Sequence, residues 1–313
     1  GTIGGPIRKN KLFFFFGYQG TATRTTPPNT ISFVPTPAML NGDFSAFDSA
    51  SCRSTGTALQ LKNPAGGTFA KNFISPSLFN PTALQVLKLV PTSNNPCGRV
   101  TYGIPNPSSE SQYLGRVDWI QNEKHTLFGR YFISDYTNPP YYNGNLLNTT
   151  RAGLADRSQS LVLGDNYSFT STLLNSFHAT GSRLAVNRGP ASDMPNPNTF
   201  GIPISVPVSN YIGLSVSGDF SAGGTIASNW IDNSWQASDD VDWIRGRHHF
   251  SFGADWIHNQ LNTIGAINEN GVFSINGQFT GDSMADFMLG LLSDFSQGNP
   301  TGGNFRQNYI GLY

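Results

Sequence analysis

The connections between strand-like segments constrain this chain most strongly. About eight segments alternate apolar and polar residues with a period of two, which predicts β-strands. These segments are 11–19, 112–120, 126–135, 158–170, 173–187, 233–244, 248–258 and 304–313. The connections at about 20–111, 136–156, 188–232 and 259–303 are long, and tight turns separate them. Such regular alternation is typical of transmembrane β-barrels, which have brief turns at one rim and large loops at the other.

The composition favours the same fold class. Charged residues make up 12% and hydrophobic residues 38% of the 313 residues, with 34 Gly and 23 Phe. Barrel strands place one face against lipid and the other against water, so their hydropathy averages out. No run approaches the roughly 18 apolar residues that a spanning helix needs. The net charge of zero gives no reason to expect a nucleic-acid partner.

The alternation assigns charged residues to the polar side of the strands. The predicted lumen-facing candidates are Arg116, Asp118, Arg130, Asp242 and Asp255. Asp239 is the exception, because its position falls on the side expected to meet lipid. Either a bulge near 238–240 or a place above the hydrocarbon would remove this conflict.

The long loops contain structural signals of their own. Cys52 and Cys97 lie in the first loop, either as a disulfide permitted by an oxidising compartment or as two unpaired thiols. Residues 271–279 alternate as a β-ribbon within a loop or as a further barrel strand. Residues 283–292 predict a short amphipathic helix, capped by Asp282 or Ser283, whose apolar stripe packs on the other loops.

No motif predicts catalysis. The chain lacks a nucleophile elbow, a zinc-protease helix, a phosphate loop and a dinucleotide fingerprint. His248 and His249 are adjacent strand residues that point to opposite faces, so they make a poor metal site. The segment 268–271 lacks calcium-loop spacing. We therefore expect no enzyme activity and no cofactor.

The segments 4–7 and 9–15, with seven further short segments along the chain, resemble one family. This family is the Oar-like TonB-dependent outer-membrane transporters, which often carry a carboxypeptidase-regulatory-like N-terminal domain. The residues at 4–7 and 9–15 resemble the junction at which the plug ends and the barrel begins. The other matching segments are 34–36, 41–45, 116–118, 124–131, 238–240, 247–255 and 285–290. They occur in the family's order and extend over nearly the whole chain.

The resemblance implies a barrel of the class with about 22 strands, whose lumen a plug closes. It also implies contacts to that plug as the role of the five lumen-facing candidates. Residues 1–10 would then be the end of the plug or a linker, and 11–313 a partial barrel domain with extracellular loops. Both ends look cut, so we expect a fragment. The implied partners are outer-membrane lipid, the plug, the TonB energy complex and an unknown bulky substrate.

The implied function is energy-coupled uptake of a bulky nutrient across the outer membrane. A non-transporting surface or adhesion barrel is the alternative, because large loops can bind partners without energy coupling. A soluble or secreted β-rich binding protein is a third hypothesis. A plug with a TonB box upstream would favour transport, and partition of the full-length product into membranes would exclude the soluble protein.

Overall fold

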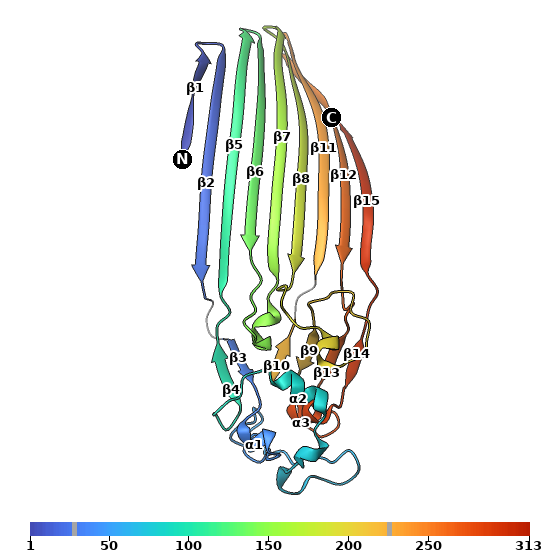
Figure 1. Cartoon of the computed structure of the whole chain (residues 1–313). Helices are drawn as coiled ribbons and strands as arrows, with labels where there is room; N and C mark the ends of the chain where they lie inside the picture. The colour runs from blue at the N-terminus through green and yellow to red at the C-terminus, as the bar shows by residue number, and fades with distance from the viewer. Residues whose placement is uncertain (27–29, 224–226) are drawn as a thin grey trace.

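The chain forms one tall antiparallel sheet that stands on a cluster of loops (Figure 1). This computed structural model describes residues 1–26, 30–223 and 227–313. The nine strands of the sheet, which we call the wall, follow one another in chain order as a meander. They are β1 (Thr2–Arg8), β2 (Leu12–Thr25), β5 (Asn106–Asn122), β6 (His125–Asn138), β7 (Gly153–Thr170), β8 (Leu173–Gly189), β11 (Ser228–Arg245), β12 (His248–Gly265) and β15 (Thr301–Leu312).

All eight predicted strands are present, and β1 is a ninth. The sequence does not predict β1, which pairs with β2 from Thr2 to Arg8 within the residues expected to be the end of a plug or a linker. The sequence does not indicate this strand, because Gly4, Gly5 and Pro6 interrupt the alternation of apolar and polar residues. Pro6 is tolerated because β1 is an edge strand, where one side needs no ladder hydrogen bonds. The domain boundary near residue 10 stays a prediction.

Most strands are longer than predicted, so the loops are shorter. β2 continues to Thr25 and β5 begins at Asn106, so the first loop is shorter than predicted at both ends. The added part pairs regularly, for example Thr23 with Ser108, but both faces there are polar. Hydrophobic alternation therefore disappears although backbone pairing continues.

The tight turns lie at one end of the wall and the long loops at the other (Figure 1). We call the described loop residues 30–105, 139–152, 190–223 and 266–300 the cap. Its strands are β3 (Thr30–Phe33), β4 (Arg99–Tyr102), β9 (Gly213–Val216), β10 (Phe220–Ala222), β13 (Val272–Ile275) and β14 (Asp294–Ser296). Its helices are α1 (Pro37–Leu40), η1 (Ala70–Asn72), η2 (Pro76–Leu78), α2 (Pro81–Leu87), η3 (Leu146–Thr150), η4 (Pro197–Phe200) and α3 (Ser283–Leu289).

The cap elements match two loop predictions and settle one alternative. The ribbon expected at 271–279 is β13, which pairs with β9 in parallel and with β14 antiparallel, so the barrel-strand alternative is wrong. The expected helix is α3. Its N-cap Asp282 accepts from the backbone N–H of Ala285, and Gly290 ends it with a φ of 75°.

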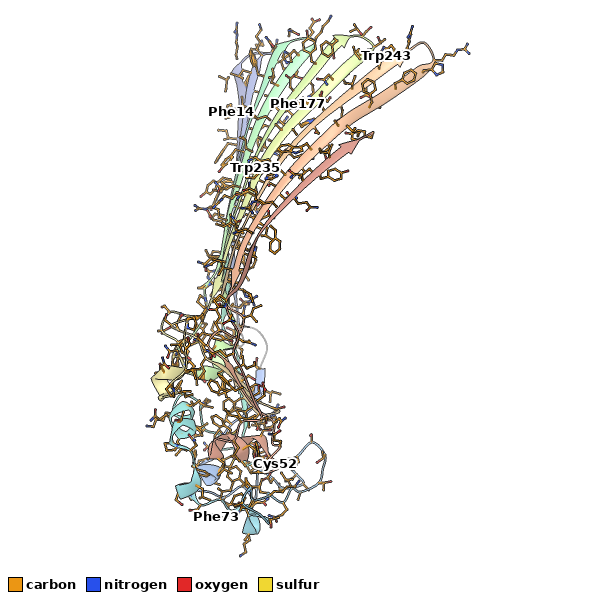
Figure 2. The ribbon with its side chains drawn as sticks, turned by 90° about the vertical axis from the view of Figure 1, so that its right-hand side faces the viewer. Phe14, Cys52, Phe73, Phe177, Trp235 and Trp243 are labelled. Atoms are coloured by element: carbon orange, nitrogen blue, oxygen red, sulfur yellow. A yellow bond between two sulfur atoms is a disulfide. The ribbon has the colours of Figure 1, made fainter. Side chains whose placement is uncertain are left out.

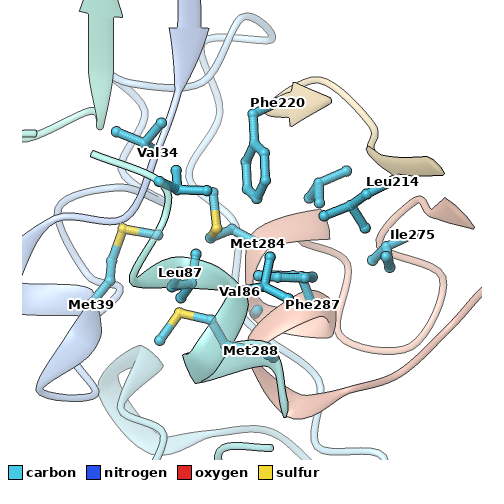
Figure 3. Packing of buried hydrophobic residues seen from close by; sticks show 14 of the residues in the cluster. Val34, Met39, Val86, Leu87, Leu214, Phe220, Ile275, Met284, Phe287 and Met288 are labelled. Atoms are coloured by element: carbon cyan, nitrogen blue, oxygen red, sulfur yellow. The ribbon is translucent and has the colours of Figure 1, made fainter. Parts of the chain in front are cut away.

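The hydrophobic core of the molecule lies in the cap (Figure 3). It joins Val34 and Met39 of the first loop to Phe220 of the third and Met284 and Met288 of the fourth. The stripe of α3 therefore packs as expected. The wall contributes no member to this cluster, and large apolar side chains such as Trp235 and Phe252 remain exposed on it. Such a surface requires an apolar environment outside the protein.

The helices of the cap are short. Among the described residues, none is long and apolar enough to cross a membrane.

Candidate functional site

The continuous register of the wall defines two faces. Residues directly opposite each other on neighbouring strands share a face, and residues two apart on one strand do too. One row across the wall consists of Phe13, Asp118, Phe128, Gly164, His178, Ser238, Asp255 and Gly311. Residues that lie an even number of positions from this row along each strand share its face. All five predicted lumen residues therefore lie on this one face, which we call the polar face.

The opposite side, which we call the apolar face, carries a band of lipid-compatible side chains. One row in this band consists of Phe14, Val117, Gly129, Leu163, Ala179, Ala237, Trp256 and Ile310. The band ends at a polar row that lies four positions nearer the cap along each strand. This row consists of Gln159, Arg183, Asn233, Gln260 and Arg306. Trp235 lies between these two rows, at the edge where barrel aromatics are expected (Figure 2).

The five predicted residues share a face but do not form one site. Arg116 binds Asp118 with two parallel hydrogen bonds, Nη2 to Oδ1 at 2.7 Å and Nε to Oδ2 at 2.9 Å. Its guanidinium also lies 4.2 Å from the centre of the Phe128 ring. Across β7 and β8, Asp242 lies 3.1 Å from His249 Nε2, and Asp255 accepts from Gln236 at 3.1 Å.

Arg130 lies opposite Arg116 on β6. The wall thus separates the five residues into a group on β5 and β6 and another on β11 and β12. Their expected role as contacts of a plug stays a prediction.

Asp239 lies within the apolar band. The register passes through 238–240 without a shift, with Asp239 opposite Phe177 and Ala254, so the predicted bulge is wrong. The nearest polar partner is Asn175, whose side-chain amide donates to Asp239. A second carboxylate on this face, Asp165, lies 2.8 Å from His125 Nε2.

Asp239→Leu is expected to stabilise the wall in a bilayer. A carboxylate in the lipid-facing band costs free energy that leucine does not, so the gain should be about 1 kcal/mol. Denaturant unfolding of the full-length protein in lipid vesicles measures it. Asp240→Leu, one residue along on the polar face, is the matched control and should give no gain. A loss of stability in Asp239→Leu would contradict the placement of this residue.

The cap contains a buried group of acidic side chains around one arginine. Arg53 Nη1 lies 3.2 Å from Asp48 Oδ1 and 3.7 Å from Asp282 Oδ2. The side chain of Asp48 is fully buried, and its second carboxylate oxygen has no hydrogen-bond partner among the described residues. Burial and then the charge of Asp282 raise the pKa of Asp48 to about 8, against the opposing effect of Arg53. Burial also raises the pKa of Asp219 and of Asp282.

The cap is expected to lose stability as the pH rises. A carboxyl group with a raised pKa binds more protons in the folded state than in the unfolded state. Its contribution to the stability of the cap is therefore complete below about pH 4 and is lost as the pH rises to about 8. Hydrogen exchange of α3 amides between pH 5 and 9, corrected for intrinsic rates, measures this slope. Asp48→Asn should flatten it.

Asp43→Asn is the control for this pH dependence. Hydrogen bonds from Ser45 lower the pKa of Asp43, so its contribution is already complete above about 4. The slope between pH 5 and 9 should therefore survive in this variant. A slope that Asp48→Asn leaves unchanged would contradict the role given to the buried carboxyl.

The two cysteines form a disulfide, Cys52–Cys97, so the alternative of two unpaired thiols is wrong. It links residue 52 to residue 97 near the end of the first loop, and both cysteines line the same cleft as Arg53. The described residues contain no group of three or more His, Cys, Asp or Glu side chains arranged to hold a metal ion.

Sequence reasoning missed a polar cavity where the wall meets the cap. It has a volume of about 570 Å³ and is lined by polar-face residues of β5, β6, β7, β8 and β11 and by the segment 150–152. We call it the mouth pocket. Arg151, Asp156 and Arg188 give it charge, and Trp230 gives it an aromatic surface. Three of these four residues lie in segments expected to be loops, and the fourth, Asp156, lies at the edge of one, so no face could be assigned to them.

The family comparison agrees with this geometry. Residues 1–313 match the model of the outer membrane beta barrel domain, so the chain belongs to this family. It is therefore a wall of an outer-membrane barrel, and the apolar face is the side that meets lipid. No curated protein matches the chain.

Two solved structures resemble the chain at low identity. The outer membrane transporter YddB from Escherichia coli has a TM-score of 0.46 at 10% identity, with 99% of this chain and 30% of that chain covered. The ferric yersiniabactin uptake receptor FyuA from Yersinia pestis has a TM-score of 0.36 at 9% identity, with 99% and 40% covered. The chain thus spans less than half of either protein.

Proposed function

We propose that the chain is part of an Oar-like TonB-dependent receptor that takes up a bulky nutrient across the outer membrane. The observation that carries the proposal is the division of the chain into a wall and a cap. The wall has tight turns at one end, and at the other end the long loops form a cap with its own hydrophobic core. Such a cap gives a large structured surface for capture above a polar barrel interior.

The short motifs that resemble this family also have structural roles in the cap. In the segment 41–45, Gly42 takes a φ of 98°, and a Cβ there would lie 2.2 Å from the Ile74 carbonyl oxygen. Phe44 of the same segment is fully buried. In the segment 285–290, Asp286 is fully buried and Gly290 ends α3. These motifs therefore support a shared cap structure as well as a shared sequence pattern.

Growth on defined nutrients tests the proposal. The gene for the full-length protein is deleted in its host, and growth is measured on peptides and oligosaccharides too large to pass through general porins. The proposal expects loss of growth on at least one such nutrient. The intact gene restores it in the presence of a functional energy complex and fails to restore it without one.

Two outcomes would overturn the proposal. Unchanged growth on all bulky nutrients, together with loss of attachment to surfaces or partner cells, would favour a non-transporting adhesion barrel. Uptake that continues without the energy complex would favour a passive channel.

A further inference from the structure

The mouth pocket presents charged groups whose bonding capacity the protein does not use. The Arg188 guanidinium lies at the cap end of β8 on the polar face, and its side chain is exposed. No hydrogen bond or ion pair joins it to another described residue. An arginine without a protein partner offers two parallel N–H donors, which match the two oxygens of a carboxylate.

Asp156 provides the complementary group. One of its carboxylate oxygens, Oδ1, is buried and has no hydrogen-bond partner among the described residues. Neither arginine of the pocket lies in an ion pair with it. A buried acceptor without a partner costs free energy, which a donor on a ligand would offset.

The remaining lining fixes a second arginine beside the cavity and adds an aromatic surface. Asn106 Oδ1 accepts from Asn138 Nδ2 at 2.6 Å and also from the guanidinium of Arg151, so Arg151 is fixed beside the cavity. Trp230 and Tyr136 contribute aromatic rings to the lining. Few convergent polar groups beside apolar surfaces are typical of small-molecule sites.

We propose that the mouth pocket binds a ligand through a carboxylate at Arg188 and a neighbouring hydroxyl or ammonium donor at Asp156. Arg151 adds positive charge, and Trp230 packs against the ligand's carbon skeleton. Acidic sugars and peptide or amino-acid termini share this chemistry. The inference deepens the proposed function, because it names the class of group that a transported substrate would carry.

Binding to purified full-length protein in detergent tests the pocket without requiring transport. One experiment compares trigalacturonate with neutral galactotriose, and a second compares the tripeptide Phe-Gly-Gly with its C-terminal amide. Isothermal titration should show that at least one carboxylate probe binds about tenfold or more tightly than its analogue without a carboxylate. The probe that does so identifies the source of the carboxylate.

Variants assign the effect to the pocket. Arg188→Gln should weaken binding of the carboxylate probe about tenfold and leave binding of the analogue without a carboxylate unchanged, as expected for loss of one charge-assisted pair. Arg188→Lys should recover part of the loss, and Asp156→Asn should weaken binding several-fold. Arg183→Gln is the matched control, since Arg183 lies on the same strand and points to the apolar face.

Three results would overturn the inference: no preference for either carboxylate probe, equal losses in Arg188→Gln and Arg183→Gln, or no loss in Arg188→Gln. Binding is measured without an energy complex, so its failure is separate from a failure of uptake. Tight carboxylate binding without growth dependence would reject the proposed transport and leave the pocket assignment standing.

Discussion

Asp286→Ala is expected to destabilise the cap by about 3–4 kcal/mol. The carboxylate is fully buried at α3. Its Oδ1 accepts from the backbone N–H of Thr280 at 2.8 Å and from the Thr280 hydroxyl at 2.6 Å, and its Oδ2 accepts from the Phe279 N–H at 3.1 Å. Alanine would leave the buried Thr280 N–H without an acceptor and would remove the acceptor of the Phe279 N–H, while the Thr280 hydroxyl could still donate to the Asp282 carbonyl oxygen.

Native-state hydrogen exchange of the α3 amides in the full-length protein measures this loss. Their exchange should accelerate roughly several hundredfold, since each 1.4 kcal/mol is a factor of ten. Asp286→Asn keeps one acceptor oxygen and should give an intermediate effect. Asp294→Ala, in the same loop on exposed β14, is the matched control and should change little. Equal protection in Asp286→Ala and Asp294→Ala would contradict the buried network.

Loss of the Cys52–Cys97 disulfide should cost the cap about 4 kcal/mol. The two residues are 45 apart in the sequence, and closing a loop of that length restricts the unfolded chain by about this amount. Cys52→Ser should therefore increase hydrogen exchange in α2, which lies between the two cysteines in sequence and packs on α3. Reducing agent should do the same to the wild-type protein.

The double substitution provides the internal control. Once one cysteine is replaced the bond is gone, so Cys52→Ser with Cys97→Ser should be no less stable than either single variant. Reducing agent should have no further effect on any of the three. Protection in α2 that stays within a few tenths of a kcal/mol of the wild-type value would contradict a stabilising role for the bridge.

The sequence predicted the centre of each wall strand because lipid and water impose opposite polarity on adjacent residues there. The same requirement ends where the wall leaves the membrane. Around Thr23 and Ser108 both faces are polar, so the pattern no longer indicates a strand although the ladder continues. β1 was not predicted for a different reason. Its glycines and Pro6 are typical of a linker, and only the pairing with β2 shows that the segment is a strand.

The candidate sites were less predictable because they depend on contacts between distant segments. The parallel pairing of β9 with β13 joins two different loops, and no local periodicity reveals it. Arg53 meets Asp282 across more than 200 residues of sequence. Arg188 and Trp230 can be assigned to a face of the wall only when the strands are known to extend to them. The charged polar-face residues on the strand centres, by contrast, were predictable from alternation alone.

Adjacent wall residues point alternately to lipid and to the barrel interior. Spin labels placed one at a time at residues 161–164 of β7, in the full-length protein in lipid vesicles, test this alternation most directly. Leu161 and Leu163 lie on the apolar face, and Val162 and Gly164 on the polar face. The labels at 161 and 163 should be accessible to oxygen and shielded from a water-soluble nickel reagent. The labels at 162 and 164 should be more accessible to the nickel reagent than those at 161 and 163. Equal accessibility of all four labels to the nickel reagent would contradict the account.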